Sequence, residues 1–178
     1  MFTAIVLAAA LQAAPAQAAP DPKAAFFAAA REGRADIVVA LLDAGAPIDA
    51  RDERGYSALT LAAYNGKVEL VRTLIKRGAD ACAGDSRGNT ALMGAAFKGD
   101  DAVAKVLLDE TACPVDQTNG QGQTALMTAS LFGREAQVRL LLAKGASATR
   151  TDASGRTALG LAKAQGATAV IGLLERAP

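Results

Sequence analysis

Two cysteines, Cys82 and Cys113, have the most definite covalent chemistry in this 178-residue chain, because two thiols can join as a disulfide. An even number of cysteines favours a disulfide in an exported chain, whereas isolated cysteines in the reducing cytosol are usually small buried apolar residues. The composition alone leaves both interpretations open. The choice depends on whether the chain is exported and on how its loops are placed.

Acidic pairs are the second set of residues that could do chemistry. They occur at residues 52–53, 100–101 and 109–110, and paired carboxylates can transfer protons or bind metal ions. They fall near expected turns and a helix end, where solvated charges are common, so we expect no metal site. The chain contains no histidine, which excludes every pairing of a nucleophile with histidine. We therefore expect no catalytic residues and no enzyme.

Phosphate or nucleic-acid binding is not expected either. Residues 120–125 fit the G-x-G-x-x-A form of a dinucleotide-binding loop, but no buried strand precedes them. Lys and Arg number 19 and Asp and Glu number 18, so the net charge of +1 creates no strong field for a phosphate backbone. The sequence predicts no cofactor and no nucleic-acid partner.

Glycines recur along the chain at a fixed period, and this period defines the elements that must position any site. Three series have spacings of 33 or 34 residues, and Thr111 stands where the third series lacks a member. The series are Gly55, Gly88, Gly122 and Gly155; Gly33, Gly66, Gly99, Gly133 and Gly166; and Gly45, Gly78 and Gly145. A repeat of this length is typical of stacked units that cannot bury their apolar faces alone.

Each repeat predicts two helices joined by a tight turn. A serine or threonine two residues after each first-series glycine can cap a short helix, and glycines of the other series can end helices in a left-handed conformation. The second helices are expected around residues 37–42, 68–75, 103–108, 138–142 and 170–174. The predicted fold class is an all-α repeat solenoid of about five stacked helix-turn-helix units with short β-hairpin-like loops.

The second unit resembles an ankyrin repeat in the blocks Asp52-x-x-Gly55-x-Ser57-Ala58-Leu59, Leu61-Ala62-Ala63-x-x-Gly66, Val68-Glu69-Leu70-Val71 and Gly78-Ala79-Asp80. The resemblance covers about residues 23–176. It implies an ankyrin-repeat domain over residues 23–178 with units at about 23–50, 51–83, 84–117, 118–150 and 151–178. It also implies a module that holds a protein partner on a concave face, without catalysis.

The chain departs from the family's Thr-Pro-Leu-His block. Alanine replaces the proline, and the histidine is replaced by Thr60, Met93, Met127 and Gly160. In the family this histidine forms hydrogen bonds between neighbouring loops. We expect these bonds to be remade or missing, and the hairpins to be somewhat looser.

Aromatic residues mark the expected binding face. Outside the first 27 residues, each aromatic lies at a hairpin tip or in the last turn of a first helix, positions that line the concave face in the family. Large aromatics carry much of the energy at interfaces, although this row could also be packing between repeats. A small-ligand or cofactor-handling protein that uses Tyr64, Phe97 and Phe132 is the alternative. The expected partner-binding residues are Glu53, Arg54, Tyr56, Tyr64, Arg87, Asn89, Phe97, Lys98, Gln121, Gln123, Phe132 and Arg156.

The N-terminus reads as a secretory signal. Residues 2–11 carry no charge, and the small-x-small pattern of residues 16–18 predicts cleavage after Ala18, which leaves residues 19–22 as a short N-terminal segment. The apolar run is too short to span a bilayer, so we expect no membrane span in the mature chain and a periplasmic or secreted location. We expect a monomer with one unidentified protein partner.

Export bears on the cysteines. Corresponding loops of stacked repeats lie too far apart for a disulfide, but the third unit carries an extra residue near Cys113 and has lost its glycine to Thr111. A rebuilt loop could bring Cys113 within reach of Cys82. We expect the disulfide, with two separately buried thiols as the alternative.

Overall fold

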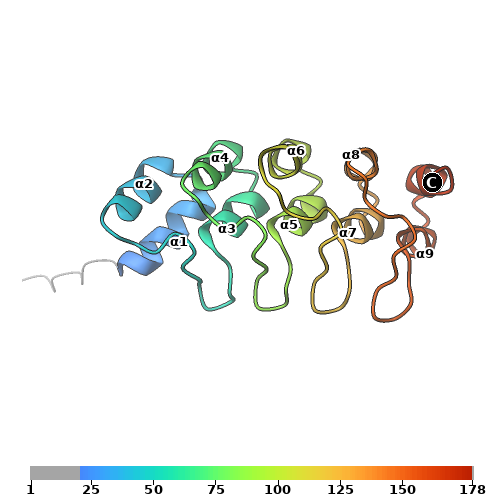
Figure 1. Ribbon diagram of the computed structural model, residues 1–178, viewed down its shortest axis with the longest axis horizontal. Coiled ribbons are helices and arrows are strands. Elements are labelled where there is room, and N and C mark those ends of the chain that lie inside the picture. The colour runs from blue at the N-terminus through green and yellow to red at the C-terminus, as the bar shows by residue number, and fades with distance from the viewer. Residues whose placement is uncertain (1–20, 178) are drawn as a thin grey trace, which may run out of the picture.

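The computed structural model describes residues 21–177, within which the chain forms ten helices in five consecutive pairs (Figure 1). The first helices are α1 (Pro22–Glu32), α3 (Ala58–Tyr64), α5 (Ala91–Lys98), α7 (Ala125–Leu131) and α9 (Ala158–Gln165). The second helices are α2 (Ala35–Asp43), α4 (Val68–Lys76), α6 (Asp101–Glu110), α8 (Glu135–Ala143) and α10 (Thr168–Leu174). The predicted all-α repeat solenoid is confirmed.

The helices form two rows, with the hairpin loops projecting beyond the row of first helices (Figure 1). First helices pack on neighbouring first helices, from α1 to α9, and second helices pack on second helices in the same order. Each pair therefore contacts mainly the pairs before and after it, as in other solenoids. The predicted cleavage site after Ala18 lies outside the described residues.

The helix boundaries follow from local chemistry. Ser57 and Thr90 each accept a hydrogen bond from the backbone N–H three residues on, at 3.2 and 3.3 Å, which satisfies a free donor at the start of α3 and α5. Gly66 and Gly78 follow α3 and α4 with φ of +69° and +87°, in the left-handed region. The predicted caps and glycine ends are confirmed.

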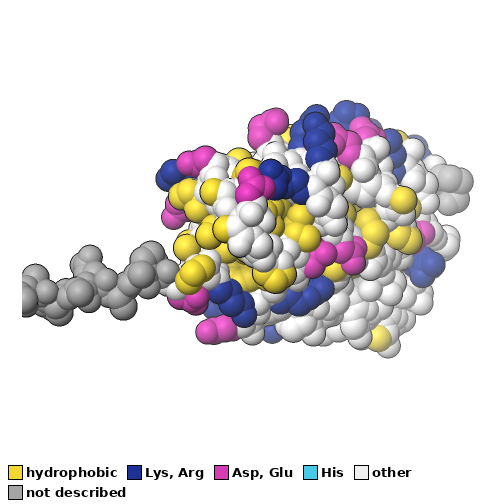
Figure 2. Space-filling view, turned by 60° about the vertical axis from the view of Figure 1, so that its left-hand side comes forward, with side chains coloured by type: hydrophobic (Ala, Val, Ile, Leu, Met, Phe, Trp, Pro, Cys, Tyr) yellow, Lys and Arg dark blue, Asp and Glu magenta, His cyan; other side chains and the backbone are white. Residues whose placement is uncertain are grey.

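Alanine and leucine fill the core between units. Ala62, Ala95 and Ala129 are fully buried, and their small side chains let consecutive first helices approach closely. Leu126 and Leu141 are also fully buried and fill the space between the two rows. Figure 2 shows hydrophobic side chains gathered at the N-terminal end of the stack, where the first unit has a neighbour on one side only.

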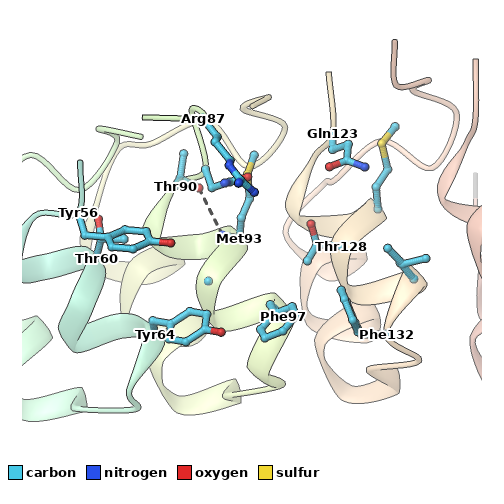
Figure 3. Close-up of a pocket in the computed structure, with 14 residues that line it drawn as sticks. Tyr56, Thr60, Tyr64, Arg87, Thr90, Met93, Phe97, Gln123, Thr128 and Phe132 are labelled. Atoms are coloured by element: carbon cyan, nitrogen blue, oxygen red, sulfur yellow. Dashed lines mark hydrogen bonds between the residues drawn. The ribbon is translucent and has the colours of Figure 1, made fainter. Parts of the chain in front are cut away.

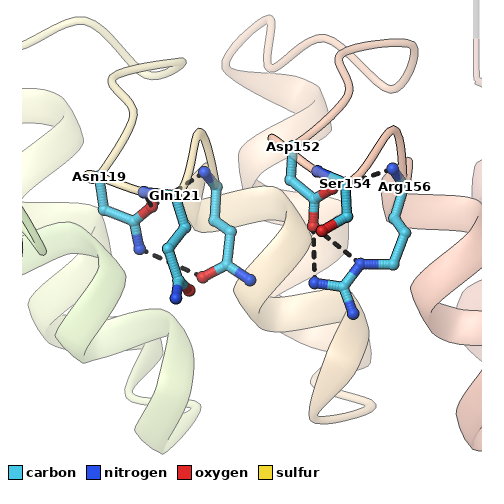
Figure 4. A network of polar contacts seen from close by, with 6 residues as sticks. Asn119, Gln121, Asp152, Ser154 and Arg156 are labelled. Carbon is cyan, nitrogen blue, oxygen red and sulfur yellow. Dashed lines mark hydrogen bonds and ion pairs between the residues drawn. The ribbon is translucent and has the colours of Figure 1, made fainter.

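One acidic or amide side chain organises each hairpin. Asp152 Oδ1 accepts hydrogen bonds from the backbone N–H groups of Ser154 and Arg156, both at 2.9 Å, and the side chain of Arg156 also donates to Asp152 (Figure 4). The N–H of Arg156 and its side chain lower the pKa of the buried Asp152 carboxyl. Asn119 makes the same two backbone contacts in its hairpin (Figure 4). These side chains fix the hairpin tips.

Hydrogen bonds also join neighbouring hairpins. The N–H of Gly120 donates to the carbonyl of Arg87 at 2.8 Å, and the N–H of Ala153 donates to the carbonyl of Gln121 at 2.9 Å. In the hairpin before these, the Ser86 hydroxyl donates to a carbonyl of the preceding hairpin at 2.9 Å. Neighbouring hairpins are thus joined by backbone and serine hydrogen bonds in a repeat that has no histidine.

The extra residue of the third unit brings its loop close to that of the second. The Cα atoms of Cys82 and Cys113 lie 5.3 Å apart and the sulfur atoms are joined as a disulfide. Thr111, in place of a glycine, ends α6 in an extended conformation and donates its hydroxyl to the carbonyl of Leu107. The disulfide connects the loops that follow α4 and α6.

Hydrogen bonds take the place of this disulfide at the adjacent junctions. The N–H of Asp80 donates to Asp49 at 2.9 Å, and the N–H of Ser147 donates to Asp116 at 3.0 Å. Cys82 occupies the position of these two carboxylates and is joined to Cys113. The disulfide therefore stands where the neighbouring junctions have a hydrogen bond to a carboxylate, and the side-chain amide of Gln117 also donates to the carbonyl of Cys82 at 2.7 Å.

An ion-pair cluster joins α6 to the end of α8. Asp109 lies 2.9 Å from Lys105 Nζ and 2.5 Å from Lys144 Nζ. Hydrogen bonds from Lys144 and then Lys105 lower the pKa of Asp109 from 3.8 to about 2. A lowered pKa in the folded state stabilises the fold above the unfolded value, and this stabilisation disappears as the pH falls through the folded value.

We therefore expect Asp109→Asn to lower the stability of the protein at pH 6 and to have no effect near pH 2. Urea unfolding at both values measures this, with the loss occurring between about pH 4 and pH 2, where Asp109 takes up its proton. The effect should be small and weakened by salt, because all three side chains are partly exposed. Equal destabilisation at both pH values would contradict the assignment.

Among residues 21–177, no helix is long and apolar enough to cross a membrane.

Candidate functional site

Three aromatic rings lie in a row on the face formed by the first helices. Tyr64, at the end of α3, stacks on Phe97 of α5 with ring centroids 5.7 Å apart and an interplanar angle of 14°. Phe97 meets Phe132, directly after α7, edge to face at 4.5 Å and 77°. The three rings come from consecutive units. Tyr64 and Phe97 occupy the same position of the repeat, and Phe132 lies one residue after that position in the fourth unit, so the rings follow one another along the face.

These rings remain accessible to solvent. Tyr64 is 40% exposed and Phe132 is 44% exposed, and they are the large hydrophobic side chains classed as exposed among the described residues. Phe97 is half-buried between them. The rings therefore pack against one another across three units and also present apolar surface to solvent.

The rings lie along one side of a groove of about 290 Å³, which we call the aromatic groove (Figure 3). Met93 and Met127 are buried beneath it, and Gly94 leaves room beside Tyr64 because it has no side chain. The lining consists of Tyr56, Thr60, Tyr64, Arg87, Asn89, Thr90, Met93, Gly94, Phe97, Gln123, Met127, Thr128, Leu131 and Phe132. The groove crosses the second, third and fourth units.

Polar side chains line the hairpin side of the groove, opposite the rings (Figure 3). Asn89 is fully engaged: its amide donates to Asp85, and its oxygen accepts from Asn119 at 2.8 Å. The oxygen of Gln123 also accepts from Asn119, at 3.2 Å, which leaves its NH₂ group available to a ligand. Arg87 projects from the third hairpin over the groove and makes no ion pair with any residue between 21 and 177.

The groove contains many of the predicted partner-binding residues, but not all. It includes Tyr56, Tyr64, Arg87, Asn89, Phe97, Gln123 and Phe132. Lys98 lies at its edge, with Nζ 4.6 Å from the Tyr64 ring centroid, a cation–π contact. Arg54 and Glu53 line separate hollows nearer the N-terminus.

Two predicted residues lie on hairpins away from the groove lining. Gln121 is exposed at its hairpin, and Arg156 is held by Asp152 in the next one (Figure 4). The structure therefore does not bring Gln121, Arg156 or Glu53 together with the aromatic rings.

Several lining residues were missed by sequence reasoning. Thr60, Met93 and Met127 occupy the position of the family's histidine, so their replacement was a usable signal for a remodelled surface. Gly94 and Thr128 occupy one position of the repeat, where the second and fifth units have Leu61 and Leu161. A small or polar residue at a position that is apolar in other units leaves space on the surface. The replacement of leucine by Gly94 and Thr128 was therefore the sequence feature that could have predicted the groove.

The chemical groups of the lining are aromatic rings, methionine side chains, hydroxyl and amide groups and the guanidinium of Arg87. Within residues 21–177 no cluster of His, Cys, Asp or Glu could hold a metal ion. The groove provides stacking surfaces and hydrogen-bond donors.

A family model described as ankyrin repeats (3 copies) matches residues 25–119 and 111–177. The chain therefore belongs to the ankyrin-repeat family. Ankyrin repeats are in general non-catalytic modules that mediate protein–protein interactions. No curated protein matches the chain.

Proposed function

We propose that this protein is an exported, non-catalytic module that binds a protein partner through the aromatic groove. The supporting observation is that the exposed large hydrophobic side chains of the described chain, Tyr64 and Phe132, both line this groove. Soluble proteins rarely expose such side chains together without a use. Their position on first helices and beside hairpins matches the face that holds partners in the family.

Energetic arguments also favour the groove. Interfaces draw most of their binding energy from a few aromatic residues near the centre, surrounded by polar side chains that exclude water. Phe97 lies at the centre of the row, contacting both other rings, while Gln123 and Arg87 form the polar border. Phe97 is therefore the expected principal contact.

Cross-linking in the exporting cell tests this proposal. A photo-reactive amino acid in place of Phe132 is expected to cross-link a protein partner, whereas the same group in place of Arg139, exposed on α8, is not. Phe97→Ala should reduce the cross-linked yield by about 10-fold or more, since loss of a central aromatic costs about 2 kcal/mol. Thermal unfolding of Phe97→Ala checks that the fold is retained. Equal cross-linking from both positions would contradict the proposal.

Small-ligand binding is a second candidate, favoured by the size of the groove. A volume of about 290 Å³ lined by two stacked rings could hold one flat molecule. Native mass spectrometry of the purified protein distinguishes the two functions. A bound small molecule that disappears in Phe97→Ala, with no protein cross-link from position 132, would favour this alternative.

Export is supported by the sequence of the first 18 residues and by the disulfide, which is typical of oxidising compartments. We expect the chain recovered from the periplasm or medium to begin at Ala19 and to contain no free thiol after unfolding without reductant. N-terminal sequencing and a thiol assay measure these two properties. A chain that stays in the cytosol with its original N-terminus would contradict the export proposal.

A further inference from the structure

We infer that the aromatic groove takes an extended acidic segment of the partner, in which a bulky apolar side chain lies beside Asp or Glu. This inference rests on the proposed function and specifies the chemistry of the partner. The apolar side chain would lie against Tyr64, Phe97 and Phe132, and the carboxylate would meet Arg87.

Arginines without an ion pair or a side-chain hydrogen bond are concentrated at this face. Most arginines of the described chain form ion pairs or side-chain hydrogen bonds, as Arg31 does with Asp52 at 2.7 Å. Arg54 and Arg87 form neither, and Arg176 at the C-terminal end is the remaining arginine of this kind among residues 21–177. Two of these three arginines therefore lie along the groove and the hollow next to it.

The groove has donors but no anionic acceptor. No Asp or Glu appears in its lining, nor in that of the adjoining hollow of about 270 Å³ that contains Arg54. Besides Arg87, the free donors are the NH₂ group of Gln123 and the hydroxyl groups of Tyr56 and Tyr64, for which the structure shows no acceptor. A ligand rich in acceptors and negative charge complements this surface.

A ligand that fills the groove from the rings to its hairpin side would also remove water from Arg87. A guanidinium that loses water without gaining a partner destabilises the complex, and a carboxylate compensates with two parallel charge-assisted hydrogen bonds. The apolar and acidic features of the ligand are therefore expected on the same short segment. A purely apolar segment would leave Arg87 buried without a counter-charge.

The length of the surface favours a segment over a compact molecule. The groove and the hollow that contains Arg54 share Tyr56, Thr60 and Tyr64 as wall residues, so the two lie side by side on one face, which extends from Phe132 to Arg54. An extended chain can place one carboxylate at Arg87 and another at Arg54. Its apolar side chain would contact the aromatic rings in the same groove. Such a segment needs alternating or adjacent acidic and apolar residues.

Selection from a displayed library of random 12-residue peptides tests this inference. We expect enrichment of peptides in which Asp or Glu lies within a few residues of Phe, Leu or Tyr. A selected peptide, labelled with a fluorophore, should bind Arg87→Gln at least about 10-fold more weakly in anisotropy titrations, because charge-assisted hydrogen bonds are strong. Arg176→Gln, which removes the same charge from another unpaired arginine, should bind like the wild type. Added salt should weaken wild-type binding more than binding to Arg87→Gln.

The outcomes separate this inference from the proposed function. Enrichment of apolar peptides without acidic residues, with affinity lost in Phe97→Ala and unchanged in Arg87→Gln, would overturn the inference and leave the groove as a partner site. Peptides that bind Phe97→Ala and Tyr64→Ala as well as the wild type would overturn both. Failure to enrich any peptide would overturn the inference, since an accessible groove of this kind must bind short segments. A charge exchange provides the strictest support: Arg87→Glu should prefer the selected peptide with its acid changed to Lys.

Discussion

Loss of the disulfide, by reduction or in the double variant Cys82→Ser with Cys113→Ser, should lower the free energy of unfolding by about 3 to 4 kcal/mol. The bond closes a loop with a sequence separation of 31, and it restricts the unfolded chain by that amount in the loop-entropy estimate. The folded state also loses the covalent connection between the two loops, which leaves the hydrogen bond from the Gln117 side-chain amide to the carbonyl of Cys82.

Urea unfolding with and without reductant measures this effect. The double variant is the control, since reductant should not change its unfolding curve. The midpoint should fall while the helices persist in the absence of urea, as seen by circular dichroism. If reductant leaves the wild-type midpoint unchanged, the two cysteines are not joined in the folded protein.

Gly55→Ala should destabilise the protein by roughly 3 kcal/mol, much more than Gly155→Ala at the same position of the last hairpin. Both glycines have positive φ, +79° and +75°, and alanine in this region costs about 1 to 2 kcal/mol. A Cβ on Gly55 would also lie 2.7 Å from the backbone nitrogen of Ser86 in the next hairpin. A Cβ on Gly155 would have no neighbouring atom of the described residues within 4 Å. Overpacking adds about 1 to 3 kcal/mol.

The difference between these two variants isolates the contact between neighbouring hairpins. Thermal or urea unfolding of both, measured against the wild type, gives the comparison directly. Equal destabilisation would mean that the hairpins separate at little cost, which would contradict the close stacking of Gly55 on Ser86.

The repeat architecture could be predicted from the sequence because its determinants are local. The left-handed ends at Gly66 and Gly78 and the cap at Ser57 depend on backbone geometry that only a few residue types satisfy, and these residues recur at one spacing. The row of Tyr64 and Phe97 was predictable for the same reason, since equal positions in adjacent units must lie side by side.

The detailed shape of the site depended on contacts between units that the spacing does not specify. Gln121 was predicted to contact a partner but is not part of the lining, while Gly94 and Met93 line the groove although they were not predicted as contacts. The acidic pair at Asp52 was interpreted as solvated charge. Its side chain instead accepts hydrogen bonds from Arg54 and Tyr56, and thus shapes the hairpin. A side chain that satisfies its own loop cannot be distinguished by type alone from one that serves a ligand.

The junction between the second and third units makes the stability of the protein depend on its surroundings. At the neighbouring junctions the carboxylates of Asp49 and Asp116 bind backbone N–H groups as soon as the chain folds. The Cys82–Cys113 bond forms only where thiols are oxidised. Chains in a reducing environment would therefore hold their two halves together more weakly, and the solenoid would acquire its full rigidity only where its thiols are oxidised.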